Sequence, residues 1–151
     1  MTVLANQTVN PEHARPTDPA TAAADCDILR YAERWLGAGI LARRVAFVLE
    51  SLPARVRGDL LDDPCFHLAL DNYQPGRGRS VWLRCPTPES NGSRSIVLKP
   101  RLAECDERFA HWVIAHELAH AFLRNRGSAE QPDPEHAADH LAAGWGFPRP
   151  H

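Results

Sequence analysis

The sequence predicts an α+β fold in which N-terminal helices precede a small antiparallel sheet and two further helices. Three observations carry this prediction: apolar residues at helical spacing between 25 and 61, short alternating segments between 66 and 99, and a strongly helical stretch at 106–126. The chain of 151 residues suits one domain with a tail. We therefore expect one domain at 25–151.

Residues 1–24 read as a disordered N-terminal tail. This segment places Pro11, Pro16 and Pro19 among small and polar residues.

Three helices are expected before the sheet. Asp25 or Asp27 could cap a first helix that ends at residue 36, and two glycines then suggest a break. A second helix is expected at 40–52 and a third at 55–61. The core stripe of the first helix is predicted to comprise Ile28, Leu29, Ala32, Trp35 and Leu36.

The middle of the chain is expected to form three strands. Phe66, Leu68 and Leu70 alternate with other residues and would lie on one face of a first strand. Residues 80–85 and 94–99 predict a second and a third strand, separated by a turn-rich connection.

The stretch at 106–126 contains the pattern H-E-x-x-H, formed by His116, Glu117 and His120. Asp106 is a plausible N-cap of this helix and Gly127 a plausible stop. Residues four apart share a helix face, so both imidazoles point the same way, as two ligands of one metal ion must. Glu117 lies beside them, where a general base for a metal-bound water is needed.

A third ligand is expected from a helix downstream. Asp133 followed by Pro134 predicts an N-cap and a first helical residue, and Glu135 and Asp139 then share a face. We assign Glu135 as the third metal ligand and Asp139 as the carboxylate that orients a ligating histidine through its other ring nitrogen.

Other ligand sets stay open at this point. Asp139 could itself be the third ligand, and His136 or His140 could serve instead.

Two runs of the sequence extend beyond the motif. The first reads Phe109-x-x-x-Val113-x-Ala115-His116-Glu117-Leu118-Ala119-His120, and the second reads Glu135-x-x-Ala138-Asp139-x-x-Ala142. Together these runs resemble the ImmA/IrrE-type metallopeptidases. The resemblance covers roughly residues 66–148. It implies a minimal zincin fold, a zinc ion held by H-E-x-x-H and a downstream glutamate, and intracellular proteolysis. In some members of the family, the proteins that are cleaved are transcriptional repressors. The E-x-x-x-D pattern, similar to that of thermolysin-like enzymes, implies that Asp139 orients His116.

The expected function is therefore zinc-dependent endopeptidase activity on an intracellular protein, such as a repressor. The alternative is a non-catalytic zinc-binding interaction or regulatory module. Glu117 favours catalysis, because a structural zinc site does not need a base. An extended substrate is expected to pair with a sheet edge near residues 81–85. The candidates for a second oxyanion donor are Tyr73, His111, His140 and His151.

Composition narrows the remaining classes. The formal net charge of −2 gives no support for direct nucleic-acid binding. The sequence does not indicate an oligomeric state. Cys26, Cys65, Cys85 and Cys105 form no C-x-x-C pair and are expected to be reduced thiols. No signal peptide is recognisable, and the longest apolar run, at 36–42, is far shorter than the roughly 20 residues that span a membrane. A cytoplasmic location is expected.

Overall fold

The computed structural model describes residues 19–71, 94–124 and 132–151, with side chains from Asp27 onward. Its elements are α1 (Pro19–Leu36), α2 (Ile40–Ser51), α3 (Ala54–Leu61), β1 (Leu68–Leu70), β2 (Ile96–Leu98), a short 3-10 helix η1 (Pro100–Ala103), α4 (Glu107–Arg124) and α5 (Pro134–Gly144). These helices and the small sheet confirm the α+β class.

Helix α1 begins at Pro19, earlier than the expected caps Asp25 and Asp27. Proline suits a first helical turn because it has no N–H to satisfy there, and the alanines that follow it favour helix. The helix therefore includes residues 19–24 of the predicted tail, whereas residues 1–18 lie outside the described residues.

The expected stripe of α1 is only partly buried. Ile28 and Ala32 belong to the core, and Leu29 and Leu36 pack against it. Trp35 remains 39% exposed, with its ring edge-on to His67, so its assignment to the core is wrong. Helices α2 and α3 each match their predicted bounds to within one residue.

The sheet differs from the prediction in strand direction. β1 and β2 pair in parallel, with Leu68 opposite Ile96 and Leu70 opposite Leu98, where we expected an antiparallel sheet. The expectation assumed that strands adjacent in sequence pair with each other. Here the first and third expected segments pair directly, and residues 71–95 are more than the dozen or so that a parallel crossover needs. The expected strand at 80–85 lies outside the described residues.

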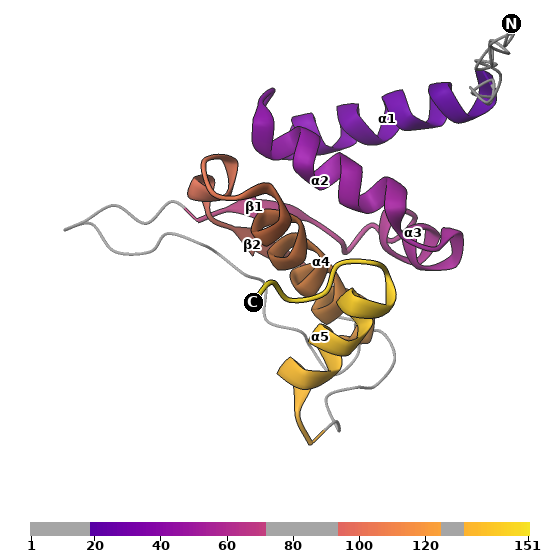
Figure 1. The fold of residues 1–151 in the computed structure, drawn as a ribbon. Coiled ribbons are helices and arrows are strands. Elements are labelled where there is room, and N and C mark those ends of the chain that lie inside the picture. The colour runs from indigo at the N-terminus through magenta and orange to yellow at the C-terminus, as the bar shows by residue number, and fades with distance from the viewer. Residues whose placement is uncertain (1–18, 72–93, 125–131) are drawn as a thin grey trace, which may run out of the picture.

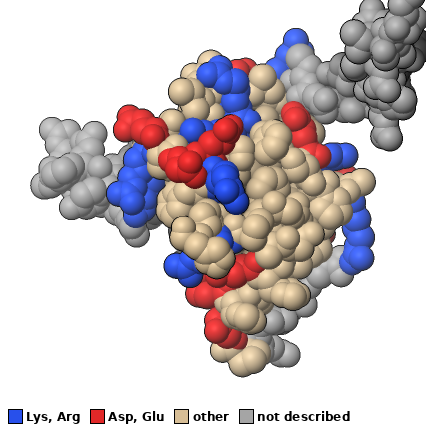
Figure 2. Space-filling view, in the orientation of Figure 1, with Lys and Arg blue, Asp and Glu red and all other residues tan. Residues whose placement is uncertain are grey.

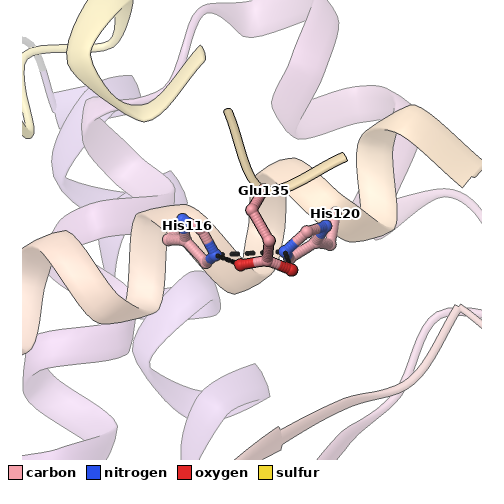
Figure 3. A group of neighbouring side chains, drawn as sticks. All are labelled: His116, His120 and Glu135. Atoms are coloured by element: carbon pink, nitrogen blue, oxygen red, sulfur yellow. Dashed lines mark hydrogen bonds and ion pairs between the residues drawn. The ribbon is translucent and has the colours of Figure 1, made fainter. Parts of the chain in front are cut away.

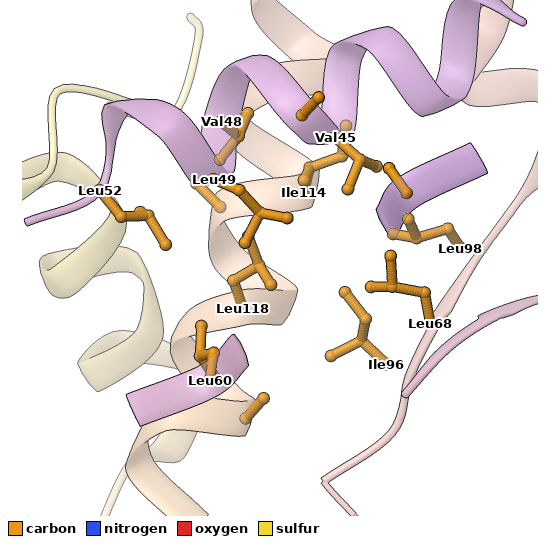
Figure 4. Close-up of a cluster of buried hydrophobic side chains, with 14 of the residues drawn as sticks. Val45, Val48, Leu49, Leu52, Leu60, Leu68, Ile96, Leu98, Ile114 and Leu118 are labelled. Carbon is orange, nitrogen blue, oxygen red and sulfur yellow. The ribbon is translucent and has the colours of Figure 1, made fainter. Parts of the chain in front are cut away.

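Helix α4 lies between the N-terminal helices and α5 (Figure 1), and it contacts α2, α3, β2 and α5. Its residues Ile114 and Leu118 are fully buried together with Val45 and Leu49 of α2 (Figure 4). The strands complete this core: Leu68, Ile96 and Leu98 are at most 2% exposed. Phe66 is buried and Leu70 packs on the core, which confirms the predicted strand face.

Arg94, just before β2, is a fully buried charged residue at 0% exposure. Its Nη1 donates to Asp63 Oδ2 at 2.7 Å and to the Asp59 carbonyl at 2.9 Å, and its Nη2 pairs with Asp59 Oδ2. Its Nε donates to the carbonyl of Ala121 at 2.8 Å. One guanidinium thus joins α3, the start of β2 and the last turn of α4, where helix carbonyls lack partners within the helix.

The surface in Figure 2 mixes acidic and basic side chains over one face of the molecule. Within the described residues, no helix is both long and apolar enough to cross a membrane. The thiols of Cys65 and Cys105 are free, as expected, whereas the side chains of Cys26 and Cys85 are not described.

Removal of the Arg94 side chain should strongly destabilise the fold. Arg94→Ala removes one donor from two carboxylates and from two backbone carbonyls, and breaking a buried pair in this way costs about 3–5 kcal/mol. The free energy of unfolding in urea measures the loss. Arg108→Ala, at an exposed position of α4, is the control and should change stability by no more than about 0.5 kcal/mol. Equal stability of the two variants would contradict the assigned role of Arg94.

Candidate metal centre

The start of α4 is fixed by the predicted cap. Asp106 Oδ1 accepts a hydrogen bond of 3.0 Å from the backbone N–H of Phe109, which satisfies one free donor of the first turn. The described helix ends at Arg124, and the predicted stop at Gly127 lies outside the described residues.

Helix α5 begins as predicted. The Asp133 side chain accepts from the backbone N–H of His136 at 3.0 Å, and Pro134 occupies the first helical position. Glu135 consequently lies in the first turn, where the helix dipole favours a carboxylate. Asp139 follows one turn later on the same face.

Helices α4 and α5 pack against each other. Both carry fully buried alanines one turn apart, Ala115 and Ala119 on α4 and Ala138 and Ala142 on α5. The distance between packed helices depends on the side chains at the contact, and short side chains permit a close approach. A close approach allows the side chain of Glu135 to reach α4.

His116, His120 and Glu135 converge in the structure (Figure 3) and form a group that could hold a metal ion. The two Nε2 atoms are 3.0 Å apart. Glu135 Oε2 lies 3.1 Å from His116 Nε2, and Oε1 lies 3.2 Å from His120 Nε2. The imidazoles are largely buried, but the Glu135 side chain is 75% exposed, so the group is accessible from solvent.

These distances fit one small cation. In a tetrahedral site with metal–ligand bonds of about 2.0–2.1 Å, neighbouring donor atoms are about 3.3 Å apart. The charge distribution points the same way, because a carboxylate and an unprotonated imidazole nitrogen are both acceptors and repel each other at 3 Å. Protons on the imidazoles or a metal cation can supply the missing positive charge.

Asp139 lies beside His116 rather than among the three converging donors. Its Oδ1 is 2.8 Å from His116 Nδ1. An ionised carboxylate only accepts, so Nδ1–H is the donor in this contact, and Nε2 is the nitrogen that faces the other donors. The expected contact between Asp139 and His116 is therefore present, and its effect on ligation stays a prediction.

Glu117 is half-buried and follows the first histidine of the group. At about 100° of rotation per residue, its side chain leaves α4 about 60° away from the direction of His120. The side chain of Glu117 therefore leaves the helix on the same half as both imidazoles. Its role as a base stays a prediction.

The rival ligands lie elsewhere. His136 and His140 are exposed on α5, and neither is part of the group that the described residues form. Among the candidate oxyanion donors, His151 is exposed at the C-terminus and Tyr73 lies outside the described residues.

His111, a candidate oxyanion donor, faces a different side of α4. It is five residues from His116, a rotation of about 140°. Its ring stacks on Phe47 at 4.7 Å between centroids and meets Phe147 edge-on at 6.1 Å. Its Nε2 is buried with no hydrogen-bond partner among the described residues. Burial lowers the pKa of His111 most, nearby Glu107 raises it and Arg44 lowers it further, and the net shift is downward from 6.5.

The C-terminal aromatic residues pack on the body of the domain. Trp145 meets Phe122 of α4 edge-on at 6.1 Å, and Phe147 contacts Phe47 of α2 as well as His111.

Sequence reasoning missed Trp112 as a neighbour of the centre. Its indole N–H donates to Asp139 Oδ1 at 3.1 Å, and Arg149 lies over its ring at 5.1 Å. The available signal was position, because Trp112 precedes His116 by one helical turn and so shares its face.

Comparison with protein-family models, with curated proteins and with solved structures gave no match. The interpretation of the centre therefore depends on its own geometry.

Loss of the Glu135 carboxylate should weaken metal binding. Partners that only orient a ligand contribute about 10–100-fold to metal affinity, so loss of a ligand itself should cost more than about 100-fold. Glu135→Ala loaded with Zn²⁺ and dialysed should hold far less metal than wild type by elemental analysis. Glu104→Gln, at an exposed glutamate before α4, should keep wild-type stoichiometry. Full stoichiometry in Glu135→Ala would reassign the third ligand.

Stability of the metal-free protein should depend on pH through His111. Between 6.5 and the lower pKa of His111 in the folded state, the unfolded chain binds more protons, so stability falls as pH drops below 6.5. The free energy of unfolding in urea should therefore fall less between pH 8 and pH 5 in His111→Phe than in wild type. Phe147→Leu disturbs the same packing but keeps the imidazole, and it should retain the wild-type pH dependence. Identical pH dependence in wild type and His111→Phe would refute the assignment.

Proposed function

We propose that this protein is a zinc-dependent endopeptidase with a minimal zincin fold, similar to ImmA/IrrE-type metallopeptidases. The observation that carries the proposal is the convergence of His116, His120 and Glu135 at distances that suit one tetrahedral cation, with Glu117 adjacent on the same helix. Two imidazoles and one carboxylate form a donor set used by catalytic zinc. A protein substrate in the cytoplasm, such as a repressor, is part of the proposal.

The residues present divide the chemistry among themselves. His116, His120 and Glu135 would hold the zinc, and Asp139 keeps His116 Nε2 free to bind it. Bound zinc supplies Lewis acidity, which lowers the pKa of coordinated water to about 7 and polarises a carbonyl. Glu117 accepts a proton on its carboxylate from the attacking water and passes it to the leaving amine.

The exposure of the centre favours catalysis over a structural role. A structural zinc is normally closed by a fourth protein ligand, and the group formed by the described residues contains three. Glu135 is 75% exposed, which leaves the centre open to a substrate. A non-catalytic zinc-binding module is the alternative, and such a module does not require Glu117.

Glu117→Gln should separate metal binding from turnover. The amide keeps the shape of the side chain but cannot take up the proton, so cleavage should fall by about 10²–10⁴-fold while zinc stoichiometry stays at the wild-type value. New protein N-termini in cells that produce wild type or Glu117→Gln, identified by mass spectrometry, report the cleavage.

Glu104→Gln is the matched control, because it makes the same chemical change at an exposed position outside the centre. It should give the wild-type set of new N-termini. If wild type and Glu117→Gln, both loaded with zinc, produce the same set, Glu117 is not the base. If wild type binds zinc and produces no new N-termini, the non-catalytic alternative replaces the peptidase.

A further inference from the structure

Two donors meet at a single oxygen next to the centre. Asp139 Oδ1 accepts from His116 Nδ1 at 2.8 Å and from the indole N–H of Trp112 at 3.1 Å. The three side chains form a chain of contacts from the indole of Trp112, through the carboxylate of Asp139, to the imidazole of His116. The Nε2 atom of this imidazole is one of the three converging donors. Trp112 and His116 are one turn apart on α4, whereas Asp139 comes from α5.

The indole contributes something that His116 alone does not. A carboxylate on a half-buried helix face can rotate about its last bond, and either oxygen can then face the imidazole. A second donor on the same oxygen, at a fixed position on α4, selects one orientation. An indole N–H can only donate, so it binds the carboxylate oxygen without competing with that oxygen for the N–H of the imidazole.

The indole itself is held from two sides. The Arg149 guanidinium lies over the indole ring, 5.1 Å from its centroid. The ring of Phe109 lies beside the indole, with 5.6 Å between the two ring centroids. A cation over the face of an indole is attracted to its π electrons. These contacts restrict the ring and keep its N–H directed at Asp139.

We propose that Trp112 is a positioning residue of the metal centre, which acts through Asp139 to hold His116 with Nε2 directed at the metal. The inference depends on the proposed zinc site. It adds one residue to the site: Trp112 orients the carboxylate of Asp139, and Asp139 orients the imidazole of His116.

The test is a double-mutant cycle on zinc affinity, measured by competition with a chromophoric chelator. Trp112→Phe keeps an aromatic ring but removes the donor, and it should raise the zinc Kd several-fold. Asp139→Ala should raise the Kd by about 10–100-fold, as expected for a partner that orients a ligand. In the double variant the Kd should equal that of Asp139→Ala, because Trp112 then has nothing to act through.

Trp145→Phe is the matched control, since Trp145 packs against Phe122 away from the three donors. It should leave the zinc Kd at the wild-type value. The proposal is overturned if Trp112→Phe binds zinc like wild type, or if its loss persists in full when Asp139 is absent. The second result would mean a general effect on packing.

A measurement on the wild-type protein keeps the inference testable even if Trp112→Phe fails to fold. In ¹⁵N spectra, the indole N–H signal of Trp112 should shift on addition of zinc more than that of Trp145. An unmoved Trp112 signal in a protein that binds zinc overturns the positioning role alone. Failure of the wild type to bind zinc at all overturns both this role and the proposed function.

Discussion

The placement of α4 is the constraint on which the rest of the structure depends, because this one helix supplies both the centre of the core and two of the converging donors. Its residues Ile114 and Leu118 are fully buried, while His116 and His120 occupy another face. Contacts with α2, α3, β2 and α5 cover much of its surface, so polar groups on it need partners within the protein. The partners come from α5, as Glu135 and Asp139.

A helix that must serve both purposes has to be fixed along its axis and in rotation. The buried guanidinium of Arg94 does this at the C-terminal end, where it donates to the carbonyl of Ala121 and is itself held by Asp59 of α3 and by Asp63 just after that helix. Ala121 directly follows His120. A shift or rotation of α4 that displaced His120 would therefore also break a buried, charge-assisted hydrogen bond. The hydrogen bond from Arg94 to Ala121 thus stabilises both the core packing of the helix and the geometry of the candidate centre.

Local patterns predicted the helices and the neighbours of the motif, because caps and i, i+4 spacing act within one element. The cap of α5 at Asp133 and the approach of Glu135 to both histidines are examples. The parallel pairing of the sheet could not be predicted, because alternation within a strand carries no information on the direction of the strand that pairs with it. Arg94 was also missed, although Asp59 on α3 and Asp63 just after this helix are both acceptors for it.

The candidate centre also couples the docking of α5 to cation binding. Two donors belong to α4 and the third to α5, so a cation that binds all three stabilises the docked arrangement of the helices. Linkage is reciprocal: contacts that hold α5 against α4 in the absence of a cation raise the affinity for it. The hydrogen bond from Trp112 to Asp139 is such a contact, and it lies outside the three donors. Affinity for a cation at this centre therefore depends on the contact between Trp112 and Asp139 as well as on the three donors, of which Glu135 is the most exposed.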